Sequence, residues 1–94
     1  MRFEVRYSDE AVQQLQALRA HDRAAIMDQI EQVLMVNPTL ESKARVKLLR
    51  QPAPTQHRLR VGEFRVFYDV VQEAVLVIQI LSKEESIAYL GEQS

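Results

Sequence analysis

The chain contains no cysteine and only two glycines, Gly62 and Gly91. Without cysteine it cannot form a disulfide, a thiol nucleophile or a thiolate metal site. Two glycines are too few for a glycine-rich phosphate loop or a dinucleotide-binding fingerprint, and no Gly-x-Ser-x-Gly motif is present. The two histidines, His21 and His57, are far apart and neither has a ligand-spaced partner. We therefore expect no metal site and no cofactor.

Long apolar runs are also missing. The longest, residues 74–80, is interrupted by Gln79 and is too short to cross a bilayer, and no cationic start precedes an apolar run at the N-terminus. We expect a cytoplasmic protein that does not associate with membranes. With 94 residues, of which 47% are hydrophobic, the sequence predicts one globular domain spanning residues 1–94.

Positive charge is concentrated, although the formal net charge is −1. Seven of the twelve Lys and Arg residues lie between Lys43 and Arg65, where Glu63 is the single acid. This distribution predicts a local positive field of the kind that attracts polyanions.

Residues 57–68 are the most informative stretch, because apolar and polar residues alternate on both sides of Gly62-Glu63. A Gly-X pair between two alternating runs predicts a hairpin with a tight type II′ turn, since glycine accepts the positive φ that the turn needs. The alternation predicts a core face made of Leu59, Val61, Phe64, Val66 and Tyr68.

The opposite face of this hairpin would carry Arg58, Arg60, Arg65 and Phe67. A two-residue turn places Arg60 directly across from Arg65, where like charges cost a few tenths to about 1 kcal/mol. An anion between the two side chains would remove this cost, because the planar guanidinium group makes bidentate contacts to phosphate. The alternative is a solvated sheet face that binds nothing.

The flanking segments predict one strand and two helices before the hairpin. Residues 2–7 alternate like a half-buried strand, and Ser8 is a helix N-cap followed by two acids. Apolar spacing predicts two amphipathic helices, with a break near residues 20–22 and an end at Asn37-Pro38.

The segments after residue 40 predict the remaining strands and a last helix. Residues 46–50 form a short strand in this interpretation, and residues 74–81 form a strand covered on both faces. A Ser-x-x-Glu capping box at Ser82 and Glu85 begins a short helix on which Ile87 and Leu90 pack, and which Gly91 closes.

These elements predict an α+β fold. It consists of an antiparallel sheet of about four strands, two N-terminal helices packed on one face, and a short C-terminal helix. The other face stays partly open, and the arginines project from it. Two-residue turns at residues 62–63 and 72–73 would place residue 62 opposite residue 83, so Lys83 would emerge beside Arg60 and Arg65.

Any catalysis by this chain must use arginine, lysine, tyrosine, His57 or an isolated acid. Such groups suit a reaction in which the substrate carries its own nucleophile. RNA cleavage by the neighbouring 2′-hydroxyl is one, because it needs a base, an acid and cations but neither a metal nor a covalent nucleophile.

The chain resembles the RelE/ParE toxins of type II toxin–antitoxin systems, and within them the RelE-like mRNA interferases. The shared features are the element order, Val-Lys-Leu-Leu at residues 46–49, Arg-Leu-Arg-Val-Gly-Glu-Phe-Arg-Val-Phe-Tyr at residues 58–68, Lys83 and Tyr89. The resemblance covers nearly the whole chain. It implies a microbial-ribonuclease-like fold and a ribosome-dependent endoribonuclease that cuts mRNA by 2′-hydroxyl attack. A ParE-like inhibitor of DNA gyrase and an inactive antitoxin-binding relative remain alternatives.

The resemblance also implies roles for individual residues. Arg65 matches an arginine that stabilises the scissile phosphate, and Tyr89 matches a tyrosine that stacks on or orients the substrate. Lys83 stands where RelE members often carry arginine, which keeps the charge but loses the planar fork. Arg60 completes the catalytic set. The RNA- or phosphate-binding set contains Arg58, Arg60, Lys43, Arg45, Lys47 and Arg50.

Simpler interpretations exist for several of these residues. Tyr89 could be an aromatic residue at the edge of the core, and the residues of the segment 43–50 could belong to a solvated loop. The partners that the resemblance implies are a cognate antitoxin in a hetero-oligomeric complex, the ribosome and mRNA. Operator DNA would be bound only through the antitoxin.

Overall fold

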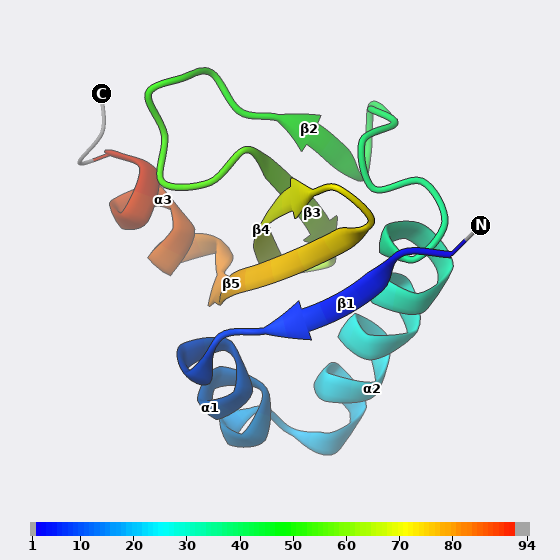
Figure 1. The fold of residues 1–94 in the computed structure, drawn as a ribbon. Coiled ribbons are helices and arrows are strands. Elements are labelled where there is room, and N and C mark those ends of the chain that lie inside the picture. The colour runs from blue at the N-terminus through cyan, green and yellow to red at the C-terminus, as the bar shows by residue number, and fades with distance from the viewer. Residues whose placement is uncertain (1, 92–94) are drawn as a thin grey trace.

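The computed structural model describes residues 2–91, which form one five-stranded sheet and its covering helices (Figure 1). Helices α1 and α2 lie on one side of the sheet, and α3 packs against the other side of its central strands. The elements in chain order are β1 (Glu4–Tyr7), α1 (Asp9–Ala17), α2 (Ala20–Gln29), the π-helical segment η1 (Ile30–Leu34) that continues α2, β2 (Val46–Leu48), β3 (His57–Val61), β4 (Phe64–Val71), β5 (Ala74–Ser82) and α3 (Lys83–Gly91).

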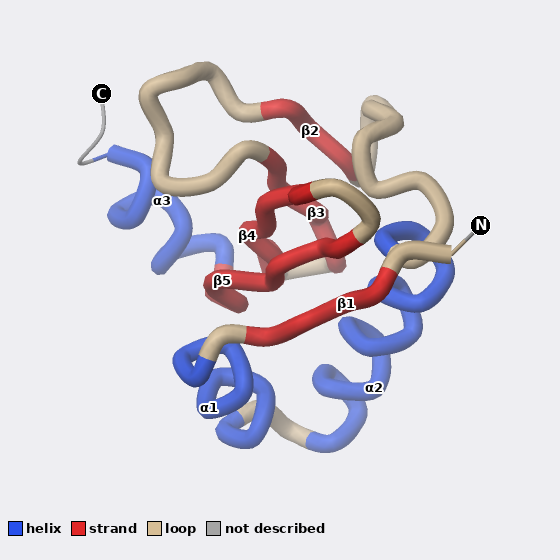
Figure 2. Tube along the Cα trace, viewed as in Figure 1, coloured by secondary structure: helices blue, strands red, loops and turns tan. Residues whose placement is uncertain are grey.

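The sheet has the strand order β1-β5-β4-β3-β2 (Figure 2). Strands β2 to β5 are antiparallel, whereas β1 pairs in parallel with β5 at one edge. The predicted α+β fold is therefore confirmed, but the sheet has five strands instead of about four, and the predicted strand at residues 2–7 pairs in parallel. The direction of β1 follows from its connection, because it leads into helices rather than into a hairpin turn that would force antiparallel pairing.

The hairpin of β3 and β4 has the predicted register. Gly62 has φ +56° in the turn, and Arg60 pairs with Arg65 while Arg58 pairs with Phe67. A side chain at position 62 would be strained at this φ, so glycine is favoured there, although Gln72 has a similar φ of +57° in the β4–β5 turn.

The register between β4 and β5 differs from the prediction by one residue. Phe67 pairs with Gln79 but Tyr68 pairs with Val77, so β5 contains an extra residue, a β-bulge. The expectation that residue 62 lies opposite residue 83 was therefore wrong. The backbone N–H of Lys83 instead donates to the carbonyl of Glu63 at 2.8 Å, which still places Lys83 at the hairpin end of the sheet.

The core lies between the sheet and the two N-terminal helices. The predicted core face is confirmed, with Leu59, Val66 and Tyr68 fully buried and Val61 and Phe64 partly buried against them. From the helices the core receives Ala11, Leu15, Ile26, Ile30 and Leu34. The hydroxyl of Tyr68 donates to the carbonyl of Pro38 at 2.6 Å, which ties the sheet to the chain that follows η1.

Side chains at the helix ends connect the helices to β5. Ser8 is the N-cap of α1 as predicted: its Oγ accepts from the N–H of Ala11 and donates to the carbonyl of Ile78. Gln14 Oε1 accepts from the N–H of Ile80 at 2.6 Å. Both contacts lie beyond the end of β1, on the edge of β5 that does not pair with β4.

The break between the helices occurs earlier than predicted, because α1 ends at Ala17 and α2 begins at Ala20. The guanidinium group of Arg23 donates to the carbonyls of Leu15 and Leu18, so an arginine of the second helix satisfies the end of the first. This long-range cap has no local sequence signature.

The capping box of α3 is confirmed in both directions. The N–H of Ser82 donates to Glu85 Oε1 at 2.8 Å, and the N–H of Glu85 donates to Ser82 Oγ at 3.1 Å. The expected packing of Ile87 was wrong, since 66% of this side chain is exposed. Among residues 2–91, no helix is long and apolar enough to span a bilayer.

We expect Tyr68→Phe to lower the free energy of unfolding by about 1–2 kcal/mol, because the buried carbonyl of Pro38 loses its donor. Chemical denaturation of the purified chain measures this change. Tyr7→Phe is the matched control, since the Tyr7 hydroxyl makes only a long contact of 3.7 Å to the sulfur of Met27. Equal effects of the two substitutions would contradict the assigned role of the Tyr68 hydrogen bond.

Candidate functional site

The sheet face opposite the core carries the predicted arginines. Arg58 and Arg60 come from β3, Arg65 comes from β4, and Lys83 is the first residue of α3. We call these four residues the cationic face. Because Arg60 and Arg65 are directly opposite one another and Lys83 is bonded through its backbone to the same turn, the structure brings all four to the β3–β4 hairpin.

Arg65 is far more enclosed than a solvated strand residue would be, with 6% of its surface exposed. Its Nη1 donates to the carbonyls of Gly62 and Phe64, both at 2.9 Å. Burial lowers the pKa of Arg65, the nearby charge of Arg60 lowers it further, and Glu63 opposes these effects. Arg65 thus closes the hairpin turn, and this contact holds its guanidinium group in one place.

Arg58 has the clearest unsatisfied donor of the cationic face. Its Nε is buried and has no hydrogen-bond partner. Burial lowers the pKa of Arg58, and the charges of Arg65 and Arg60 lower it further. A buried donor without a partner costs free energy, so an incoming oxygen acceptor at this position would be favoured.

Tyr89 lies farther along the same face, where α3 crosses β4. Its ring meets Phe67 edge to face, with ring centroids 5.0 Å apart. Burial raises the pKa of Tyr89, and the negative charges of Asp69 and Glu10 raise it further. The hydroxyl therefore stays protonated at neutral pH and can act as a donor.

Phe67 is a part of this face to which the sequence analysis gave no role. It is fully buried although it alternates with arginines. An aromatic residue in an otherwise charged strand face was the available signal that something covers that position. The cover is α3, and the contact with Phe67 fixes where the Tyr89 ring lies.

No carboxylate neutralises the cationic face within residues 2–91. The ion pairs in this part of the chain lie away from the cationic face and join Arg6 to Glu4 and His21 to Asp22. The like charges of Arg58, Arg60 and Arg65 are therefore in no ion pair and are offset only in part by the nearby charge of Glu63, which is unfavourable in the isolated chain and favourable for binding an anion.

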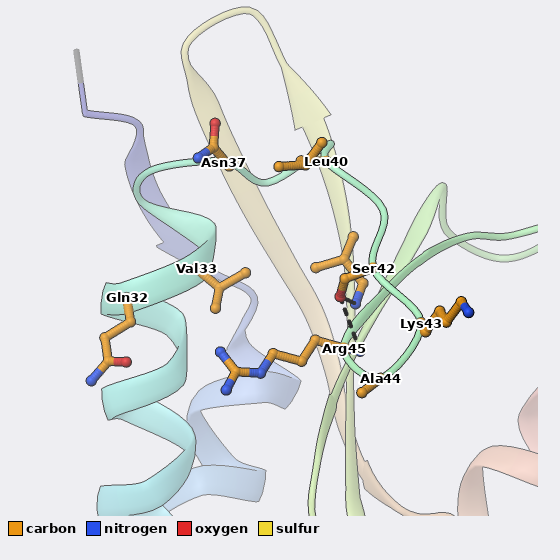
Figure 3. A pocket seen from close by; sticks show the side chains of 9 residues that line it. Gln32, Val33, Asn37, Leu40, Ser42, Lys43, Ala44 and Arg45 are labelled. Carbon is orange, nitrogen blue, oxygen red and sulfur yellow. Dashed lines mark hydrogen bonds between the residues drawn. The ribbon is translucent and has the colours of Figure 1, made fainter.

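The predicted peripheral cations border two different cavities, and Lys43 borders both. Lys43 and Lys47 line a cavity of about 510 Å³ together with Arg58, and Lys47 is the cross-strand partner of Arg58. Arg45 instead lines a second cavity, beside η1, and Figure 3 shows its side chain extending toward Val33. Arg50 is exposed and lines neither cavity.

His57 does not belong to the cationic face. It is buried on the core side, where its ring stacks on Tyr68 with centroids 5.3 Å apart. Burial lowers the pKa of His57, while Asp69 and Glu41 oppose the shift. Across the described part of the chain, no group of three or more histidines and carboxylates is placed to hold a metal ion.

Comparison with protein families decides the relationship. A family model described as "ParE toxin of type II toxin-antitoxin system, parDE" matches residues 5–87. The chain belongs to this toxin family. It is thus a type II toxin of the RelE/ParE superfamily, as the sequence resemblance indicated. Comparison with curated proteins finds no match.

Solved structures share the fold of this toxin at low sequence identity. A chain of the RelBE2 toxin–antitoxin complex from Mycobacterium tuberculosis matches with a TM-score of 0.74 and 20% identity, covering 87% of this chain and 99% of that one. A chain of the archaeal RelE–RelB complex from Pyrococcus horikoshii matches with a TM-score of 0.71 and 21% identity, covering 88% of this chain and 97% of that one. A mutant of Escherichia coli RelE in the free state matches with a TM-score of 0.71 and 17% identity, covering 98% of this chain and 97% of that one.

We expect Arg65→Ala to destabilise the toxin by about 1–3 kcal/mol, because two turn carbonyls lose their donor and a buried side chain is removed. Arg60→Ala should change stability by less than about 0.5 kcal/mol, since Arg60 is exposed and its removal relieves a like-charge pair. Chemical denaturation of both variants tests this difference. Equal destabilisation by the two substitutions would contradict the proposal that Arg65 stabilises the turn more than the exposed Arg60 does.

The pKa values of Tyr7, Tyr68 and Tyr89 are all raised by burial, and these are the three tyrosines of the toxin. The folded toxin should therefore show less phenolate absorbance at about pH 10 than the unfolded chain, whose tyrosines are half ionised there. The folded state retains protons that the unfolded state releases, so stability should fall as the pH rises above about 10. Absorbance titration of folded and urea-unfolded toxin measures this. Coincident curves would contradict the burial of the three hydroxyls.

Proposed function

We propose that this toxin is a ribosome-dependent endoribonuclease that cuts mRNA by attack of a 2′-hydroxyl on the adjacent phosphate, and that a cognate antitoxin neutralises it. The observation that supports this most directly is the cationic face, where Arg58, Arg60 and Arg65 converge with no carboxylate partner within the described residues. Attack of the 2′-hydroxyl places additional negative charge on the phosphate oxygens. Donors that are already in position stabilise that charge without further reorganisation.

Arg65 is the proposed stabiliser of the transition state. Its Nη1 is held by the carbonyls of Gly62 and Phe64, which leaves the Nε and Nη2 donors of the same planar group for a phosphate. Because the turn fixes the guanidinium group, binding a phosphate costs little side-chain entropy. Arg60, directly opposite, would contact the same phosphate from the other strand.

Lys83 is the proposed acid that protonates the leaving 5′-oxygen, while the proton of the attacking 2′-hydroxyl passes to solvent water, so that a 2′,3′-cyclic phosphate and a 5′-hydroxyl end are formed. Its backbone N–H is bonded to Glu63, so the side chain starts next to the hairpin turn that holds Arg65. Arg58 would bind a phosphate through its unpartnered Nε, and Lys43 and Lys47 extend this positive surface along the adjacent cavity. In this proposal Arg45 and Arg50 contact the RNA or the ribosome outside this group.

Tyr89 is the proposed contact for a nucleobase. Its ring is held against Phe67, and its raised pKa keeps the hydroxyl as a hydrogen-bond donor. The cationic face and Tyr89 together supply charge and positioning, whereas the one buried histidine faces the core. A site of this kind depends on its substrate being presented in the reactive geometry, and the ribosome would hold the mRNA in that way.

A second candidate function is inhibition of DNA gyrase, which the family match favours because its description names ParE. The cationic face would then contact a protein or DNA surface and no RNA would be cut. In either case the antitoxin would cover the cationic face, and the pair would bind operator DNA through the antitoxin in the cytoplasm.

We expect induction of the toxin without antitoxin to produce new mRNA 5′ ends at one phase of the codon, confined to translated frames. Arg60→Gln should reduce these ends roughly 100-fold or more, because it removes a charge from the transition state but no hydrogen bond that the fold uses. Sequencing of 5′ ends shortly after induction measures both results.

Arg19→Gln is the matched control, since Arg19 is an exposed arginine at the start of α2 and makes no side-chain cap. It should cut like the unmodified toxin. Purified toxin should cut mRNA with ribosomes and not without them. Growth arrest with no new 5′ ends but with broken DNA would replace this proposal by gyrase inhibition.

A further inference from the structure

A cavity of about 510 Å³ lies between η1 and the loop that precedes β2 (Figure 3). Its aliphatic lining continues from the core, because Val46 is 1% exposed and Val33 is packed against the core cluster. At the rim, 65% of Leu40 is exposed. A large aliphatic side chain in water next to an open apolar cavity is typical of a surface that binds a partner.

The charge of this cavity is of one sign. Lys43 and Arg45 line it, and its lining residues include no aspartate or glutamate. Neither cation is in an ion pair with any residue from 2 to 91. Figure 3 shows the Arg45 side chain extending from the loop toward η1, where its guanidinium group lies near Val33, while the N–H of Arg45 donates to Ser42 Oγ at 3.2 Å. The guanidinium group therefore borders the apolar floor and lacks a carboxylate.

We infer that this cavity binds a segment of the cognate antitoxin in which an aliphatic side chain stands next to a carboxylate. The aliphatic side chain would cover Val33 and Leu40, and the carboxylate would form a bidentate pair with Arg45. The inference rests on the proposed function only in taking the antitoxin as the partner.

The lining favours a peptide over an RNA base. Proteins bind the bases of single-stranded RNA largely by stacking them on aromatic side chains. No aromatic residue lines this cavity. Aliphatic walls with a cation at the rim match an aliphatic side chain beside an acid. The cavity also lies beside η1, on the helix side of β2, so an antitoxin could be anchored here while another of its segments covers the cationic face. Two linked contacts raise the overall affinity through effective concentration.

The test is Leu40→Asp, titrated calorimetrically with the antitoxin encoded in the same operon. The added carboxylate should repel the partner's acid and remove an apolar contact, weakening binding roughly tenfold or more. Val71→Asp is the matched control, because Val71 is 50% exposed at the far end of β4 and lines a different part of the surface. It should bind within about twofold of the unmodified toxin.

Arg45 provides a second and independent measurement. Arg45→Gln should weaken binding and make it less sensitive to salt, whereas Arg45→Lys should restore part of the affinity, since lysine keeps the charge without the fork. Unchanged affinity of Leu40→Asp, or an antitoxin that binds none of these proteins, would overturn the inference.

Assaying mRNA cleavage by Leu40→Asp in the absence of antitoxin separates this inference from the proposed reaction. Leu40 lies in a loop outside the cationic face, so the variant should cut as the unmodified toxin does. If neither the unmodified toxin nor the variant cuts mRNA, but antitoxin binding still depends on Leu40 and Arg45, the ribonuclease proposal fails and the docking site stands.

Discussion

The register of the β3–β4 hairpin is the constraint on which the rest of the site depends. Gly62 accepts the positive φ of the turn, and the pairing that follows sets Arg60 against Arg65. A shift of one residue would send the arginines into the core and the aliphatic residues into water. The burial of Leu59 and Val66 therefore enforces the position of every charge on the opposite face.

The same hairpin joins stability and function in one residue. Arg65 is buried in the turn and donates to two of its carbonyls, while it stands beside two other arginines. The hydrogen bonds offset part of the repulsion between the three guanidinium groups, and they also hold Arg65 in place for an incoming phosphate. A loss of toxicity on changing Arg65 is consequently informative only when stability is measured as well. Arg60, which is exposed, allows the two contributions to be separated.

Local patterns were sufficient to predict the hairpin, its register, the N-cap at Ser8 and the capping box of α3, because each depends on residues close together in sequence. The parallel pairing of β1 and the bulge in β5 depend on contacts between distant segments, so alternation alone could not show them. The position of Lys83 was predicted from a β4–β5 register that was wrong by one residue. The bulge in β5 shifts Lys83 by that one residue, and Lys83 still lies at the hairpin end of the sheet.

The depth of the arginines was the least predictable part of the site. Alternation assigns Arg58 and Arg65 to a face but does not reveal that the Nε of Arg58 is buried or that Arg65 is enclosed at the turn. Phe67 carried the missing information, since a large aromatic side chain on a charged face requires a cover. Arg45 shows the opposite difficulty. The density of positive charge in the sequence groups Arg45 with Lys47, whereas the structure places Arg45 at the cavity beside η1 and Lys47 at the cavity beside Arg58.

Strand β5 extends beyond the end of β1, and α1 closes the edge that is left. Ser8 donates to the carbonyl of Ile78, and Gln14 accepts from the N–H of Ile80. Backbone groups that are occupied by side chains cannot serve as a template for a strand of another molecule. The most apolar strand of the protein is thus protected from edge-to-edge aggregation by two polar side chains of a single helix, and a substitution at Gln14 would expose that edge while leaving the cationic face untouched.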